Sequence, residues 1–165
     1  MRRTPLYGPL AWLFGRRAVV ANASMHPLLV PGERVLFDRL AYRAWPPERG
    51  DVALLELLVR EPRRMVKLVV GLPGERVSVA ADQLWIDGRS LPFPQPVVGS
   101  MPGEWQLGPT EYFVLSYAAA VGTDSRHFGP LPRGALAGRA WLVYWPPDRR
   151  RRIERLRLEL AARPP

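Results

Sequence analysis

The sequence predicts a mainly β fold, an antiparallel barrel or sandwich that is only partly closed. Short apolar runs of four to nine residues recur along the chain, and 19 prolines and 14 glycines are spread between them. Runs of this length, broken by turn residues, are typical of strands in all-β domains. The expected strands cover residues 34–38, 51–58, 65–70, 76–80, 83–86, 111–117 and 137–145.

Two turn signals place a hairpin in the middle of the chain. Ala81-Asp82 separates two of the predicted strands and Asp87-Gly88 follows the second, so residues 76–86 are expected to pair. A chain of 165 residues with 47% hydrophobic composition is long enough for one core. Residues 18–147 are therefore assigned to a single domain.

The C-terminal residues 148–165 carry much of the positive charge. The net charge is +9, and 7 of the 24 basic residues lie in these 18 positions. A basic helix is expected over residues 148–162, because Ile153, Leu156 and Leu160 then share one side. A basic tail suits nucleic acid or the anionic surface of a membrane. Nucleic acid is disfavoured, because the sequence has no helix-turn-helix and no aromatic-basic strand motif.

An apolar run at residues 5–15 lies near the N-terminus, between the basic pairs Arg2-Arg3 and Arg16-Arg17. The run is too short to cross a bilayer, which takes roughly 20 apolar residues in a helix. Residues 1–17 are therefore expected to form a short segment at the membrane interface. The alternative is a hydrophobic arm that packs on the domain itself.

The composition argues against metal chemistry. The chain has no cysteine and only two histidines, His26 and His127. Disulfides and thiolate ligands are thereby excluded, and a zinc site is not expected. No cofactor is predicted.

Lys67 is the only lysine in a chain that has 23 arginines. In an extended run Met65 and Val69 flank it on the same face, so its amine lies among apolar neighbours. Arginine stays protonated, whereas a lysine in apolar surroundings loses its proton readily and can act as a base or nucleophile. The alternative is an edge-strand lysine that discourages aggregation.

Ser24 lies in a run of small residues, ahead of the turn Pro31-Gly32 and a predicted strand. A serine hydroxyl is a weak nucleophile that needs a base, and a neutral lysine can be that base without any histidine. The alternative is that Ser24 caps the local turn through its hydroxyl.

Three motifs in order resemble the type I signal peptidase family, the peptidases with a serine–lysine dyad. Ser24-Met25-His26-Pro27, with Gly32-Glu33 after it, is similar to the family's nucleophile box. Residues 67–75, Lys-Leu-Val-Val-Gly-Leu-Pro-Gly-Glu, are similar to the box that contains the lysine. Asp124-Ser125-Arg126, followed by Phe128-Gly129, resembles the third box. The resemblance covers about residues 18–146 and implies the family's catalytic-domain fold.

The resemblance also implies a serine endopeptidase that removes signal peptides from exported precursors after small residues. Ser24 is then the nucleophile and Lys67 the general base. The backbone N–H of Ser24 and the side chain of Asn22 are expected to hold the oxyanion. The positions that match the family's shallow substrate pockets are Val20, Met25, Leu29 and Val66. The implied partners are signal-peptide-bearing precursors and the anionic surface of a bacterial cytoplasmic membrane, with the catalytic domain on its extracytoplasmic side.

The third box departs from the family's pattern. The family has a Gly-Asp-Asn run where this chain has Ser116-Tyr117-Ala118, and an arginine where it has Leu68, so both members of one charge pair are missing. The hydroxyl that the family places beside the lysine falls at Gly122, with Thr123 next to it as a possible substitute. Asp124 and Arg126 are retained and are expected to brace this loop.

Other interpretations stay open. A dedicated maturation or conjugative-transfer peptidase of the same superfamily uses the same chemistry on its own substrate. A self-cleaving repressor-type peptidase also uses serine and lysine, but it usually has a DNA-binding domain, for which this chain has no room. A non-catalytic β module that binds anionic membrane through its arginine-rich tail explains the charge but not the three ordered motifs.

Overall fold

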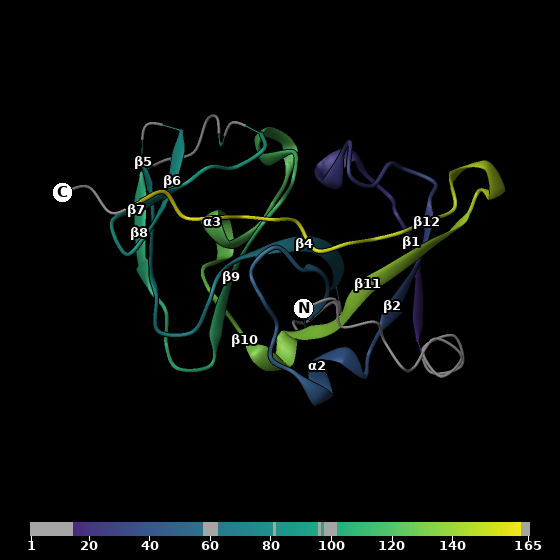
Figure 1. Ribbon diagram of the computed structural model, residues 1–165, viewed down its shortest axis with the longest axis horizontal. Helices are drawn as coiled ribbons and strands as arrows, with labels where there is room; N and C mark the ends of the chain where they lie inside the picture. Colours follow the sequence, from purple (N-terminus) through teal and green to yellow (C-terminus); the bar gives the residue numbers. More distant parts are fainter. Residues whose placement is uncertain (1–14, 58–62, 81, 96, 98–101, 163–165) are drawn as a thin grey trace.

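The computed structural model describes residues 15–57, 63–80, 82–95, 97 and 102–162. Within these ranges the chain forms two antiparallel sheets that lie side by side, with short helical turns at their margins (Figure 1). The predicted mainly β, antiparallel fold is confirmed. The larger sheet is open and not closed into a barrel.

The larger sheet has eight strands and the smaller has four. The strands of the larger sheet are β1 (Arg16–Val19), β2 (Arg34–Asp38), β3 (Val52–Leu57), β4 (Arg63–Gly71), β9 (Glu111–Leu115), β10 (Leu131–Pro132), β11 (Leu136–Trp145) and β12 (Arg151–Arg152). Those of the smaller sheet are β5 (Arg76–Ala80), β6 (Gln83–Ile86), β7 (Arg89–Leu91) and β8 (Gly103–Gln106). The α-helices are the single turns α2 (Ala41–Ala44) and α3 (Ser125–Phe128), and a 3₁₀ turn covers Ala23–Met25.

All strand pairs are antiparallel, and several strands that are neighbours in a sheet are far apart along the chain. The larger sheet runs β1-β2-β11-β3-β4-β9-β10, with β12 paired to β11, and the smaller runs β7-β6-β5-β8. Each of the seven predicted strands is present, and the predicted hairpin is β5–β6, with Val77 opposite Ile86 and Ala80 opposite Gln83. Asp87 and Gly88 both have positive φ and turn the chain into β7.

Alternation along β3, β4 and β9 builds a core on both faces of the larger sheet. Leu54, Leu68 and Phe113 belong to the cluster that also holds the apolar side chains of the smaller sheet. Their neighbours in sequence Leu55, Val69 and Val114 belong to a second cluster on the opposite face. Trp105 of β8 packs on Phe113 with ring centroids 4.8 Å apart, so the first cluster joins the two sheets.

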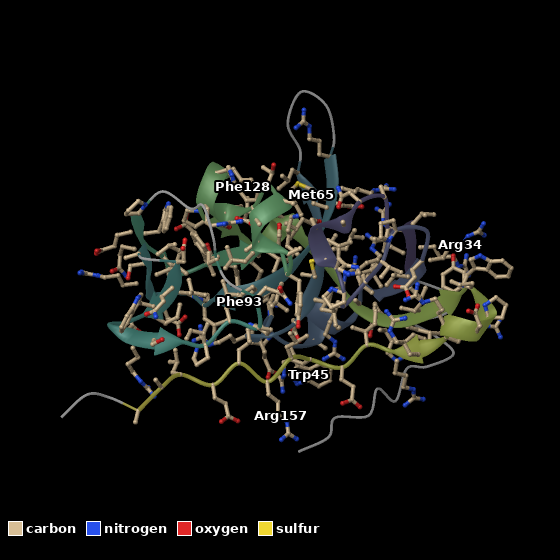
Figure 2. The ribbon with its side chains drawn as sticks, turned by 90° about the horizontal axis from the view of Figure 1, so that it is seen from above. Arg34, Trp45, Met65, Phe93, Phe128 and Arg157 are labelled. Carbon is tan, nitrogen blue, oxygen red and sulfur yellow. The ribbon has the colours of Figure 1, made fainter. Side chains whose placement is uncertain are left out.

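The predicted C-terminal helix is wrong. After β12 the chain continues as an extended strap over residues 153–162, which crosses from the larger sheet to the smaller one (Figure 1). Ile153, Leu156, Leu158 and Leu160 pack on the first core cluster. In Figure 2 the strap runs along the edge opposite Met65, and Arg157 points away from the body.

Backbone hydrogen bonds hold the strap in place at both sheets. The N–H of Leu156 donates to the carbonyl of Gly50, ahead of β3, and the N–H of Ala161 donates to the carbonyl of Ser90 in β7. A side chain at position 50 would overlap the Leu156 carbonyl, and Gly50 also has a φ of +87°. Both observations require glycine there.

Most of the predicted interfacial segment 1–17 lies outside the described residues, which begin at residue 15. Its last two residues, Arg16 and Arg17, belong to β1 and pair with Phe37 and Leu36 of β2. In the described part of the chain, no helix has both the length and the apolar character that crossing a bilayer requires.

Candidate active site

A 3₁₀ turn, Ala23–Met25, presents Ser24 at the end of β1. Met25 is fully buried in the first core cluster and anchors the turn. The carbonyl of Ser24 accepts a 2.9 Å hydrogen bond from the N–H of Ala118, and the N–H of Leu29 donates to Met25 at 2.8 Å. The hydroxyl is thus held on a short, well-anchored turn, and Ser24 as a whole residue is only 8% exposed.

Lys67 points at this serine from the middle of β4. Its partner on the adjacent strand β3 is Ala53, and Lys67 as a whole residue is 3% exposed. The Lys67 Nζ lies 3.2 Å from the Ser24 Oγ and 3.0 Å from the Ser116 Oγ. The predicted serine and lysine, 43 positions apart in sequence, are therefore within hydrogen-bond distance in the folded chain.

Burial lowers the pKa of Lys67 from 10.5 to about 8. The carboxylate of Asp124 acts in the opposite direction and raises that pKa, while the Arg126 guanidinium lowers it further. A lysine with a pKa of about 8 is about one tenth neutral at pH 7. A neutral amine can accept a proton from a serine hydroxyl.

Asp124 and Arg126 form a buried ion pair that contacts the backbone of Ser116. Arg126 Nε and Nη2 donate to the two carboxylate oxygens of Asp124 at 2.8 and 2.9 Å. The same carboxylate accepts a 2.8 Å hydrogen bond from the backbone N–H of Ser116, and it caps α3. Arg126 also donates to the carbonyl of Ala119, so the pair connects α3 with the loop that follows β9.

Ser116 is a residue that the sequence interpretation missed as a partner of Lys67. It directly follows β9, the strand next to β4, and is fully buried. The sequence signal was a lone polar residue at the end of a buried apolar strand. The resemblance to the family placed Ser116 in the position of the Gly-Asp-Asn run and the hydroxyl at Gly122 or Thr123. The structure places Thr123 on the wall of the cleft, where it is exposed.

Asn22 lies beside Ser24 with its side chain in an unexpected orientation. Its Oδ1 accepts a 3.2 Å hydrogen bond from the N–H of Ser24, as an N-cap of the 3₁₀ turn. In this arrangement the N–H that is expected to bind an oxyanion already has an acceptor. The amide of Asn22 has to rotate before its Nδ2 can donate to a reacting carbonyl oxygen.

A cleft of about 420 Å³ opens at the dyad. Of the predicted pocket residues, Val20, Met25 and Val66 line it, together with Ser24 and Lys67. Leu29 is fully buried in the core and is not among the described residues that line the cleft. The other lining residues are Val19, Ala21, Asn22, Arg63, Arg64, Met65, Val121, Gly122 and Thr123.

The sequence matches known proteins over most of its length. A sequence model of the family described as signal peptidase, peptidase S26, matches residues 10–145. The chain is 27% identical over 140 residues to the probable signal peptidase I-2 of Synechocystis sp., covering 79% of this chain and 63% of that protein. It is 31% identical to signal peptidase I of Leptolyngbya laminosa, covering 82% and 74%.

A third relative is the mitochondrial ATP-independent inner membrane protease subunit 1a of Arabidopsis thaliana, which is 34% identical over 80% of this chain and 74% of its own length. The chain thus spans 63% of the length of the Synechocystis relative and about three quarters of the other two. On the family match and these identities, the chain belongs to the signal peptidase family, peptidase S26.

Proposed function

We propose that this chain is a signal peptidase I-like serine endopeptidase that removes signal peptides from exported precursors after small residues. Membership of the signal peptidase family supports the peptidase activity. The single observation that carries the mechanism is the 3.2 Å contact between the Ser24 hydroxyl and the buried amine of Lys67. A buried, neutral lysine is a sufficient base for a serine nucleophile.

In the acylation step the Ser24 Oγ attacks the carbonyl carbon of the bond to be cut, and its proton passes to the Lys67 Nζ. The carbonyl oxygen becomes an oxyanion. When the tetrahedral intermediate collapses, the C–N bond breaks and the lysine gives its proton to the leaving amine. The signal peptide is then bound to Ser24 as an ester and the mature protein is free to leave.

Deacylation uses the same groups with water as the nucleophile. Lys67, neutral again, takes a proton from the water that attacks the ester carbonyl, and it returns that proton to the Ser24 oxygen as the ester bond breaks. In both steps the backbone N–H of Ser24 and the rotated Nδ2 of Asn22 stabilise the oxyanion. Such donors act where charge develops in the transition state.

The walls of the cleft support a preference for small residues. Val20, Met25 and Val66 are apolar side chains that line the space next to Ser24. Met25 and Val20 are almost completely buried and belong to the core cluster, so they have little freedom to move aside. A precursor with alanine before the cut bond is therefore preferred over one with leucine or phenylalanine.

The test is cleavage of a synthetic precursor by the purified protein. Ser24→Ala and Lys67→Arg are each expected to abolish cleavage while the fold, checked by circular dichroism, is retained. Arginine keeps the charge but does not give up its proton. A signal-peptide-mimicking, serine-directed inhibitor should form a covalent adduct at Ser24. Cleavage by Lys67→Arg within a few-fold of the unsubstituted protein would exclude the dyad.

Two alternatives make different predictions in the same assay. A dedicated maturation or conjugative-transfer peptidase cleaves its own precursor and leaves general signal peptides intact, so a panel of precursors separates it. A membrane-binding module without catalysis gives neither cleavage nor an adduct. That module has less support, because Arg149 and Arg151 of the tail pair with the buried Glu33 and are not simply free for lipid.

We also propose attachment to the anionic surface of a bacterial cytoplasmic membrane, with the catalytic domain outside the cytoplasm. The apolar run 5–15 is expected to give a salt-resistant contribution and the exposed tail arginines a salt-sensitive one, about 1 kcal/mol each near an anionic surface. Deletion of residues 1–15 should remove the vesicle binding that survives high salt. Equal sedimentation of the deleted and intact chains would show that the run packs on the protein.

A further inference from the structure

Lys67 has a second hydroxyl partner that the dyad chemistry does not by itself require. Ser116 Oγ lies 3.0 Å from the Lys67 Nζ, slightly closer than the Ser24 Oγ at 3.2 Å. A lysine amine ends four rotatable bonds and turns freely unless a second contact fixes it. When a neutral Lys67 donates an N–H to Ser116, its lone pair is left to face the Ser24 hydroxyl.

Ser116 is itself held rigidly. It follows Leu115, which pairs with Leu68 of β4, so its backbone is fixed to the strand that carries the lysine. Its N–H donates to the buried Asp124 carboxylate at 2.8 Å, and its own side chain is fully buried. Water therefore does not compete for its hydroxyl, and the partner that orients Lys67 is set by the sheet and not by an exposed loop.

Gly122 explains why there is space for this hydroxyl. A Cβ at position 122 would overlap both the Oγ and the Cβ of Ser116, and it would lie 3.3 Å from the Cβ of Ser24. Gly122 has φ −111° and ψ 137°, extended backbone that any residue adopts. The backbone conformation at position 122 does not require glycine. Glycine is required there because any side chain would overlap that of Ser116. Positions 116 and 122 share one volume that only one side chain can fill.

We propose that Ser116 is the positioning residue that aims the amine of Lys67 at Ser24, and that Gly122 is the glycine this arrangement requires. The inference rests on the proposed function for its kinetic consequences. The two positions are then exchangeable: a serine at 122 can supply the hydroxyl if residue 116 gives up its side chain. Thr123 is not needed for this role.

The first test is Ser116→Ala, assayed by single-turnover cleavage of a synthetic precursor. The rate constant should fall roughly 10- to 100-fold, as for a misaligned reacting group, while KM stays within about twofold. The pH at which the rate is half-maximal should also fall, because the ammonium form loses a hydrogen-bond acceptor. Wild-type rate and an unshifted pH profile would overturn the inference.

The second test exchanges the two side chains. Gly122→Ser alone should be impaired, because its side chain overlaps that of Ser116. The double variant Ser116→Gly/Gly122→Ser should regain activity to within a few-fold of wild type. The matched control Ser116→Gly/Gly122→Ala fills the same space without a hydroxyl and should stay impaired. Equal rates for the two double variants would overturn the role of the hydroxyl, and this comparison holds even if Ser116→Ala folds poorly.

A third readout separates failure of this inference from failure of the proposed function. Because the chain has a single lysine, ¹³C-labelled lysine gives one side-chain NMR signal, which can be titrated without cleavage. The titration midpoint should shift to lower pH in Ser116→Ala and return in the serine exchange variant but not in the alanine control. If wild type cleaves nothing but these shifts occur, the proposed function fails and the positioning contact stands. If wild type cleaves and no shift occurs, the positioning contact fails.

Discussion

Two buried side chains that can carry charge, Glu33 and Lys67, have opposite surroundings. Glu33, 1% exposed, receives two hydrogen bonds from Arg151 at 2.6 and 3.0 Å and one from the N–H of Val30. Lys67, 3% exposed, has only the two serine hydroxyls within hydrogen-bond distance among the described residues. One charge is matched by an opposite charge at contact distance, and the other is not.

The two pKa values reflect that difference. Burial by itself raises the pKa of Glu33, but Arg151, Val30 and Arg149 together outweigh it, so the carboxyl stays ionised with a pKa below its usual value. Burial lowers the pKa of Lys67 to about 8, and the more distant Asp124 only partly offsets this. A buried charge that stabilises the fold has an oppositely charged partner. A buried amine that has to be neutral to accept a proton, as proposed for Lys67, has neutral partners.

Removing the unpaired charge should have the largest effect, with opposite signs for activity and stability. Lys67→Met is expected to lower cleavage by more than about 10³-fold. It should also raise the free energy of unfolding at pH 7 by roughly 3–4 kcal/mol, because the lysine pKa falls from 10.5 to about 8 on folding and each pKa unit is worth about 1.4 kcal/mol. Below pH 8 the lysine of the wild type is mostly protonated in both the folded and the unfolded chain, so the gain in stability from Lys67→Met has its full size. It should shrink from pH 8 to 10.5, where only the unfolded chain stays protonated. A variant less stable than wild type at pH 7 would contradict this account.

Asn22 is a polar residue without charge that caps the turn containing Ser24. Asn22→Ala should lower kcat by about 10²- to 10³-fold, the usual effect of losing one oxyanion donor. Asn22→Asp should lose at least as much, since a carboxylate still caps Ser24 but cannot donate. Unchanged kcat in Asn22→Ala would mean that the Ser24 N–H acts without this side chain.

The pH dependence of wild-type cleavage follows from the unpaired amine. The reactive form is neutral, so the single-turnover rate should rise about tenfold per unit below pH 8 and level off above about pH 9, roughly 100-fold in all from pH 6. A flat profile over that range would contradict Lys67 as the base. Glu33→Gln should leave the midpoint unchanged, because Glu33 is not a partner of the amine.

Breaking the paired charge should affect stability alone. Arg151→Met leaves the Glu33 carboxylate buried with a weaker partner, Arg149 at 3.4 Å, and is expected to lower the free energy of unfolding by about 2–4 kcal/mol. The double variant Glu33→Gln/Arg151→Met should recover much of this loss. Arg150→Met, whose guanidinium is exposed, is the matched control and should change stability by less than about 0.5 kcal/mol. Chemical denaturation measures all three.

The sequence was sufficient for seven of the strands, because these depend on local patterns, and the resemblance of three ordered motifs to the family paired Ser24 with Lys67. Apolar runs between turn residues marked all seven expected strands, and the single lysine among apolar residues marked Lys67. Five strands were missed: β1, β7, β8, β10 and β12. They are four residues long or fewer, which is too short for a pattern of apolar and polar residues to distinguish them from loops.

A helix was predicted for the C-terminal tail because its apolar residues were assigned a helical periodicity. Ile153, Leu156 and Leu160 fit a helical stripe, but Leu158 lies between two of them, and Leu156, Leu158 and Leu160 alternate with Arg157 and Glu159 in the period of two that extended chain requires. The strap buries that face on the core. The contact of Ser116 with Lys67 was missed for a different reason. The two residues are 49 positions apart, and their contact depends on the absence of a side chain at Gly122, which no local sequence pattern predicts.

The strap has a consequence for how the domain folds. Arg89 of the smaller sheet donates to the carbonyl of Ala161, 72 positions away, and Arg151 donates to the carbonyl of Leu28, 123 positions away. Contacts of such long range form late, because the loops that they close cost much chain entropy. Each sheet can pair its own strands earlier, and the core contacts between the sheets, such as Trp105 on Phe113, do not include the tail; residues 151–161 then add contacts to both sheets. A chain that lacks this stretch would expose the apolar side chains that Leu156 and Leu158 cover, and exposed apolar surface of this kind promotes aggregation.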